Sequence, residues 1–160
     1  MQGAVLALVI VGIVAIVVAI GLAAAHLWAS SQMEQADEQV AFASANLASL
    51  AGELASHAAD LVGRARFQDE LTDGAADVAT ERVLALRRAV DGLEAGRSGA
   101  NAMEDATDEL VAVLDGMRVP PDPALVDDVR EACHGLGSAS KVRNELASSW
   151  VGLLAYGLRR

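Results

Sequence analysis

The most apolar part of the chain is an unbroken run over residues 4–25, and no charged side chain occurs before Glu34. A helix of about 20 residues crosses the roughly 30 Å hydrocarbon core of a bilayer, so this run is long enough to span it. Trp28 follows shortly after, where an aromatic ring anchors a helix at the membrane interface. The pattern predicts a transmembrane anchor over residues 1–30 that contacts lipid through residues 4–27.

A cleaved signal peptide is the main alternative for this run, and residues 23–25 (Ala-Ala-Ala) resemble a cleavage site. A signal peptide has a basic amino-terminal region and an apolar stretch of about 7 to 15 residues, and this sequence matches neither feature. A retained anchor is therefore favoured. The orientation is left open, because the positive-inside rule counts bases near the span and the first one is Arg64.

Beyond the run, four stretches repeat their apolar positions at alternating spacings of four and three, the pattern of helices packed in a bundle. The repeated positions are Ala36, Val40, Ala43, Leu47, Leu50, Leu54, His57 and Leu61; Ala79, Val83, Leu86, Val90 and Leu93; Met103, Ala106, Leu110, Val113 or Leu114, and Met117; and Leu125, Val129, Ala132, Leu136, Ala139, Arg143, Leu146, Trp150 and Leu153. Because the links are short, we expect an all-α chain, with the transmembrane helix followed over residues 31–160 by an up-down antiparallel bundle of long helices.

Residue types at the ends of these stretches predict where the helices begin. Residues 72–74 (Thr-Asp-Gly) form a turn that can cap the second helix. Asn101 and Glu104 have the spacing of a capping box for the third helix. Asp122, followed by proline, predicts the start of the last helix. Whether residues 75–117 form one interrupted helix or two is left open.

Three features inside the helices modify this picture. No residue between Trp28 and Gly63 interrupts the first helix, so the membrane helix is expected to continue into the bundle as one rod. Gly135 and Gly137 cost about 1 kcal/mol each inside the last helix, which predicts a kink there. Arg143 occupies an apolar position and needs a carboxylate partner or a path to solvent.

Charge and cysteine content exclude several classes of protein. The formal net charge is −10, from 22 acidic and 12 basic residues, and nucleic-acid binding needs a basic face instead. Cys133 is the single cysteine, so the chain has no internal disulfide and no thiol pair for a zinc or redox site.

Glu131 and His134 are the strongest candidates for metal chemistry. Their Glu-x-x-His spacing places a carboxylate and an imidazole on one helix face, as in di-iron bundles. A di-iron site needs a second such pair and two further inward Glu residues, and the other candidate pair, Glu53 and His57, has the spacing of an ordinary surface pair. A metal-binding oxidoreductase bundle is thus the alternative function, and we assign no residue a catalytic, cofactor-binding or metal-binding role.

Other titratable residues favour structural interpretations. Cys133 and His134 point about 100° apart on a helix and cannot act together as nucleophile and base, so Cys133 is expected to be a packed thiol. His57 is expected to be satisfied by its neighbours, with a pH-sensitive or partner-contacting imidazole as the alternative. The four acidic residues between positions 104 and 109 are expected to form a solvated helix start. Arg159–Arg160 give only a weak signal for anionic lipid.

Three segments resemble the LemA family, whose members have one transmembrane helix followed by a long-helix bundle. Residues 46–57, from Asn-Leu to a final His, look like the family's Asn-Leu-Val segment that leads through Gly and Ala to His. The Val-Pro pair at 119–120 is similar to the family's Tyr-Pro turn, and residues 139–154, with Asn144 and Trp150, look like its C-terminal helix. Ala58 stands where the family has Glu. The resemblance implies a membrane protein without known catalytic residues, some relatives of which are associated with membrane organisation.

We therefore expect a single-pass protein of the cell membrane that is not an enzyme. Its bundle is expected to act as a scaffold or interaction surface, for a protein partner or a second copy of the chain, with organisation of a membrane or a membrane complex as the implied role. An accessory subunit of a larger membrane complex is a further alternative, because Gly12 and Gly21 are points of close approach within the span.

Overall fold

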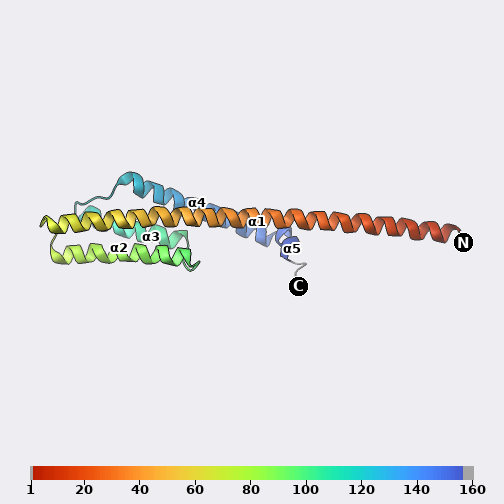
Figure 1. Ribbon diagram of the computed structural model, residues 1–160, viewed down its shortest axis with the longest axis horizontal. Coiled ribbons are helices and arrows are strands. Elements are labelled where there is room, and N and C mark those ends of the chain that lie inside the picture. The colour runs from red at the N-terminus through yellow and green to blue at the C-terminus, as the bar shows by residue number, and fades with distance from the viewer. Residues whose placement is uncertain (1, 157–160) are drawn as a thin grey trace. The chain divides into compact units, whose positions relative to one another are not determined.

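Good helix formers and helical apolar spacing agree along most of the chain, and the computed structural model is helical through most of residues 2–156, the part that it describes, with side chains described from residue 9. This part contains α1 (Gln2–Phe67), α2 (Asp73–Glu94), α3 (Ala100–Gly116), α4 (Pro123–Ser148) and α5 (Trp150–Tyr156), and no strand (Figure 1). The predicted all-α bundle is confirmed. The expected rod is also confirmed, because α1 is one helix, and the region 75–117 holds two helices.

The chain packs as two compact units. One unit comprises the described parts of Met1–Glu38 and Val142–Arg160, and the other comprises Gln39–Lys141. The helices α1 and α4 each contribute residues to both units. The second unit, called the bundle unit below, also contains the whole of α2 and α3.

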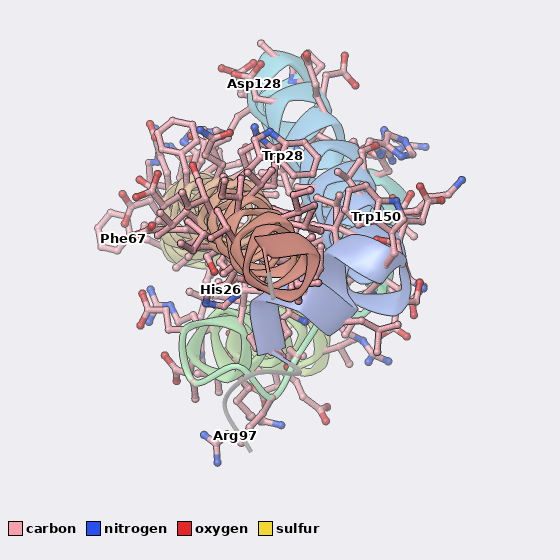
Figure 2. The ribbon with its side chains drawn as sticks, turned by 90° about the vertical axis from the view of Figure 1, so that its right-hand side faces the viewer. His26, Trp28, Phe67, Arg97, Asp128 and Trp150 are labelled. Carbon is pink, nitrogen blue, oxygen red and sulfur yellow. The ribbon has the colours of Figure 1, made fainter. Side chains whose placement is uncertain are left out.

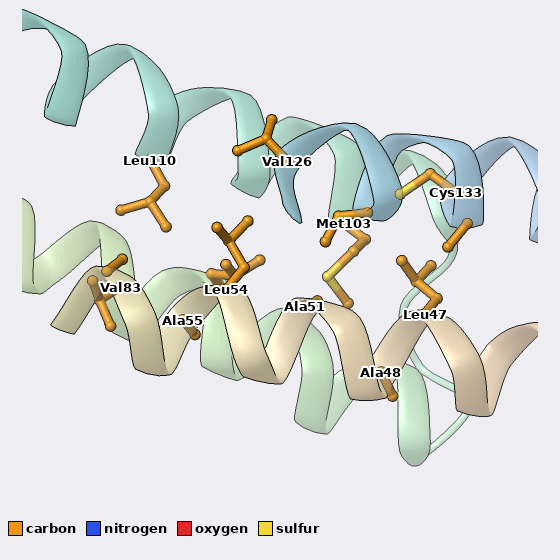
Figure 3. Packing of buried hydrophobic residues seen from close by; sticks show 14 of the residues in the cluster. Leu47, Ala48, Ala51, Leu54, Ala55, Val83, Met103, Leu110, Val126 and Cys133 are labelled. Atoms are coloured by element: carbon orange, nitrogen blue, oxygen red, sulfur yellow. The ribbon is translucent and has the colours of Figure 1, made fainter. Parts of the chain in front are cut away.

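The core of the bundle unit consists of aliphatic side chains from four helices. Leu54, Leu86 and Leu110 are fully buried, and Met103 projects from α3 into the space between the helices (Figure 3). Close packing of such side chains supplies about 1.5–3 kcal/mol for each large residue that is removed from water. Thr107 is the one buried polar residue in the described part, and its hydroxyl has no hydrogen-bond partner there.

The buried face of α1 lies beside the predicted apolar seam and not directly on it. Leu50, His57 and Leu61 of that seam are only half-buried. The buried positions on this face are Leu47, Ala48, Ala51, Leu54, Ala55, Ala58, Val62 and Ala65. Their spacing averages close to the 3.6 residues per turn of a straight helix, so the face drifts away from a strict seven-residue repeat. Because alanine side chains are small, the neighbouring helices can approach α1 closely along this face. The spacing of the larger apolar residues did not indicate this face.

Two of the three predicted helix starts are confirmed. The Thr72 hydroxyl accepts a hydrogen bond from the Ala75 N–H at 3.3 Å, and α2 begins directly after it. The Asp122 carboxylate accepts one from the Ala124 N–H at 3.0 Å, at the start of α4. Each bond satisfies a backbone donor that has no partner within its helix.

The predicted capping box of Asn101 and Glu104 is wrong. The N-cap of α3 is Gly99, which makes no side-chain cap, and its backbone is extended, with φ −117° and ψ −179°. The helix begins as soon as the glycine-containing link ends. Asn101 therefore already lies in the first turn, where its side chain cannot serve as the N-cap.

Three helices end in the same way, with a left-handed residue just past the last turn. These residues are Asp69 (φ 59°), Gly96 (φ 66°) and Arg118 (φ 60°). In each case the following N–H donates to the carbonyl five residues earlier, at 2.7–3.0 Å. This is the hydrogen bond of a Schellman motif, which usually places glycine at the left-handed position. Only one of the three stops uses glycine.

The helix α4 continues through Gly135 and Gly137, where a kink was predicted, and ends at Ser148. The break comes at Ser149, whose hydroxyl donates to the Leu146 carbonyl at 2.7 Å and accepts from the Val151 N–H at 3.2 Å. These local bonds compete with the helical ones.

The turn at Ser149 also needs glycine at position 152, because a Cβ there would overlap the backbone of Ala147. The break rotates the chain beyond it. Trp150 and Leu153, which were predicted to face the core, are consequently exposed, and Val151 and Ala155 are buried instead.

Candidate functional site

The apolar stretch of α1 is exposed in the part of the chain that the structure describes. Within the described part of the chain, α1 is the one helix that is long and apolar enough to cross a membrane, and none of its most apolar stretch is buried. Every large aliphatic side chain from Val9 to Leu22 is exposed by more than half. Soluble proteins rarely expose a continuous apolar surface of this kind.

All five aromatic residues of the chain lie on its surface. The exposed fractions of Trp28, Phe42, Phe67, Trp150 and Tyr156 range from 46% to 91%. Aromatic side chains normally supply much of the buried apolar area, and they are enriched at interfaces. The core here is built from Ala, Leu, Val and Met, so the aromatic residues are available for contacts outside the fold.

Two of these aromatic residues belong to a cluster that joins α5 to α1 just past the apolar run. The rings of Trp28 and Trp150 stack with centroids 5.7 Å apart and planes inclined by 19°. The Nδ1–H of His26, whose side chain is labelled in Figure 2 together with Trp28 and Trp150, donates a hydrogen bond to the Leu154 carbonyl oxygen at 2.6 Å. The small core beneath the rings consists of Ala29, Met33, Val151 and Ala155. We call the residues of this paragraph the juxtamembrane cluster.

Arg143 has the carboxylate partner that the sequence required. Its Nε donates to the Asp37 carboxylate at 2.8 Å, and both side chains are half-exposed. This hydrogen bond and the negative charge of Asp37 raise the pKa of the Arg143 guanidinium. Exposed pairs of this kind contribute at most about 1 kcal/mol, so the bond mainly fixes α4 against α1 within its unit.

A surface groove of about 460 Å³ lies between α1 and α4 in the bundle unit. Its apolar lining includes Phe42, Leu50 and Ala132, and its polar lining includes Asp128 and Glu131. Phe42 is 76% exposed at this site. An apolar surface with carboxylates beside it suits a segment that carries both apolar and basic side chains.

The candidate metal ligands are distributed over the surface. Glu131 lines the groove and His134 is exposed on α4, while Glu53 is exposed and His57 half-buried on α1. Among the residues that the structure describes, no three His, Cys, Asp or Glu side chains are grouped closely enough to hold a metal ion. The described part of the chain therefore does not bring Glu53 and His57 together with Glu131 and His134, as a di-iron site would require.

Cys133 is a buried free thiol, as predicted. Burial raises its pKa to about 11, and the nearby carboxylates of Glu104 and Asp108 act in the same direction. Both effects disfavour the thiolate, which is the reactive form. The thiol is therefore a packing group in the bundle core.

The sequence predicted that the acidic residues at the start of α3 form a solvated surface, but two of them also form ion pairs with other helices. Among the described side chains Glu104 and Asp105 form no ion pair. Asp108 accepts a hydrogen bond from Arg130 at 2.8 Å, and Glu109 accepts one from Arg82 at 2.8 Å. The bond to Asp108 raises the pKa of Arg130. Arg82 and Arg130 lie next to the apolar seams of α2 and α4. This position in the sequence was the available signal that they could form ion pairs with α3.

Comparison of the chain with family models, with curated proteins and with solved structures finds no match.

Proposed function

We propose that this chain is a single-pass, membrane-anchored scaffold whose helical bundle binds a protein partner at the surface of the cell membrane. The observation that carries the proposal is the division of α1, which is exposed and apolar in its first part and core-forming in its second. Lipid would cover the exposed part, since a bilayer removes apolar surface from water. The helix α1 contributes residues to both the anchor and the bundle unit.

The resemblance to the LemA family supports the same function, because that family combines one transmembrane helix with a long-helix bundle. The role in membrane organisation that the resemblance implies needs a surface of the bundle that contacts a partner. Phe42 and the groove beside it are the part of the bundle that we assign to this contact. The chain's net charge of −10 and the carboxylates of Asp128 and Glu131 favour a partner segment with basic residues.

Site-specific crosslinking in intact membranes tests this function. A photoreactive phenylalanine analogue is placed at position 42 of the full chain, and the control carries it at position 67, which is also aromatic and exposed. A C-terminal tag allows purification and identification of the adduct by mass spectrometry. We expect one discrete adduct from position 42, with a protein partner or a second copy, and none from position 67.

The matched variants Phe42→Ala and Phe67→Ala give an independent measure. If Phe42 is an anchor of the interface, Phe42→Ala lowers co-purification of the partner with the tagged chain, without photocrosslinking, roughly tenfold, whereas Phe67→Ala leaves it unchanged. A chain that is monomeric in the membrane and forms no adduct from position 42 would contradict the scaffold function.

A further inference from the structure

Two uncharged stretches of the sequence meet in the juxtamembrane cluster. No Asp, Glu, Lys or Arg occurs in residues 1–33 or in residues 146–158. The His26 to Leu154 hydrogen bond and the Trp28–Trp150 stack join these stretches, although they are far apart in the sequence. The C-terminal helix therefore packs on α1 at the point where the apolar run ends.

The helix α5 is apolar on both of its faces. Val151 and Ala155 are buried in one cluster with Ala29 and Met33 of α1. On the other side, Trp150 and Leu153 are exposed by 60% and 73%. A helix on the surface of a soluble bundle carries polar residues on its outer face, so the outer face of α5 is unsuited to water.

The neighbouring surface of α1 continues this apolar area. Leu27 and Trp28 are exposed there, and Tyr156 extends the area at the end of α5. Trp and Tyr rings are the side chains that concentrate at the boundary between headgroups and acyl chains. We call Leu27, Trp28, Trp150, Leu153 and Tyr156 the aromatic patch.

The position of the patch along α1 identifies what covers it. At 1.5 Å per residue, Trp28 lies about 5 Å beyond the end of the apolar run at Ala25. The interfacial layer on each side of the hydrocarbon core is about 6 Å thick. Trp28 and the ring stacked on it therefore fall within this layer when the run spans the bilayer.

We propose that α5 is an interfacial membrane helix, whose outer face enters the boundary between headgroups and acyl chains of the bilayer that α1 crosses. This inference rests on the proposed function, since it requires that α1 spans the membrane. The chain then contacts the membrane at two points of the same compact unit, the apolar run of α1 and the outer face of α5. A helix at a membrane interface binds through the apolar area that it buries there, which Trp150 and Leu153 supply.

The test measures the depth of single tryptophans in the full chain. The protein is reconstituted into vesicles of phosphatidylcholine with one-fifth phosphatidylglycerol. Trp28→Phe leaves Trp150 as the only tryptophan, and Trp150→Phe leaves Trp28; phenylalanine preserves an aromatic contact in both variants. A third variant combines both changes with Phe67→Trp and serves as a control in the bundle unit, because Phe67 is exposed and lies outside the groove. Quenching by lipids with brominated acyl chains is compared with quenching by aqueous acrylamide.

We expect brominated lipid to quench Trp150 to within about twofold of Trp28, and the tryptophan at position 67 to be quenched by acrylamide alone. In the Trp28→Phe background, Leu153→Asp should lower the lipid quenching of Trp150. The same change in the Trp150→Phe background should leave the quenching of Trp28 unaltered. Circular dichroism checks that each variant keeps its helical content.

Three outcomes would overturn the inference. Lipid quenching of Trp28 without quenching of Trp150 would leave the anchor in place and remove α5 from the membrane. Shielding of Trp150 from both lipid and acrylamide would show that protein covers the patch, as in a second copy of the chain. Absence of lipid quenching at both tryptophans would contradict the membrane anchor itself, and with it the proposed function.

Discussion

The Nδ1–H of His26 donates a 2.6 Å hydrogen bond to the carbonyl oxygen of Leu154, which lies 128 positions further along the chain. Carbonyls in the last turn of a helix have no partner within it, so His26 satisfies an acceptor at the end of α5. A side chain at the end of the predicted membrane span thereby holds the C-terminal helix in place.

Removal of this imidazole should loosen α5. His26→Ala is expected to cost about 1 kcal/mol locally, which corresponds to roughly fivefold faster hydrogen exchange of the α5 amides. His134→Ala is the matched control, because His134 is exposed and makes no side-chain hydrogen bond within the described residues. Equal exchange rates in the two variants would show that the bond does not hold α5.

Two glycines of the C-terminal region should respond in opposite ways to alanine. Gly152→Ala introduces a Cβ into the space of the Ala147 backbone, so the turn at Ser149 must open and α5 must leave α1. Gly137→Ala meets no atom within 4 Å in the middle of α4, and it should stabilise the chain by about 1 kcal/mol. Chemical unfolding in detergent, followed by circular dichroism, measures both changes. Stabilisation by Gly152→Ala would refute the close approach.

The helix stop at Arg118 should improve with glycine. A residue with a side chain pays about 1 kcal/mol for the left-handed conformation, which glycine adopts freely. We expect Arg118→Gly to increase the free energy of unfolding by about that amount. The converse change, Gly96→Ala, should decrease it similarly, because Gly96 also has a positive φ. Stability that is insensitive to both changes would argue against these helix ends.

Cys133 should make the stability of the bundle sensitive to alkaline pH. Its pKa is raised from 9.0 to about 11 in the folded chain, first of all by burial. Below about pH 9 the thiol is neutral in both states and stability is unaffected. Between about pH 9 and 11 only the unfolded chain ionises, so stability falls as pH rises.

This pH dependence is measured as the difference in unfolding free energy between pH 8 and pH 10. The native chain should lose more than Cys133→Ala, which has no thiol to ionise. The same burial should make alkylation of the folded thiol at pH 8 roughly a hundredfold slower than alkylation of the unfolded thiol. Equal alkylation rates in the two states would contradict a buried thiol.

The sequence was sufficient to predict the helices whose core faces consist of large aliphatic residues. Val83, Leu86 and Leu110 were predicted to be core residues and are buried. Ala36 was predicted to be buried, but Ala51 and Ala55 of α1 were missed. A small residue is compatible with either face of a helix, and only the neighbouring helices decide which alanines are buried. The break at Ser149 was missed because two local hydrogen bonds cause it, and serine is also common inside continuous helices.

The candidate sites were less predictable than the fold. Arg143 occupies a position of the apolar seam, which indicated that it needs a carboxylate partner. The identity of that partner, Asp37, follows only from the packing of α4 on α1. The exposure of Trp150 depends on the rotation of the chain after Ser149, so periodicity alone placed it in the core. The groove beside Phe42 is formed by two helices, α1 and α4, packed in one register. The apolar pattern of a single helix carries no information about that register.

Membrane topology is the most direct test of the central claim, which is that α1 crosses the bilayer and continues into the bundle. In a Cys133→Ser background, single cysteines are introduced at Gln2 and at Phe67, the first and last residues of α1. Sealed vesicles are then treated with a membrane-impermeant maleimide before and after detergent. The account predicts that one of the two positions reacts in intact vesicles and that the other reacts only after detergent is added. Reaction of both positions from the same side, or loss of residue 2 from the mature chain, would contradict it.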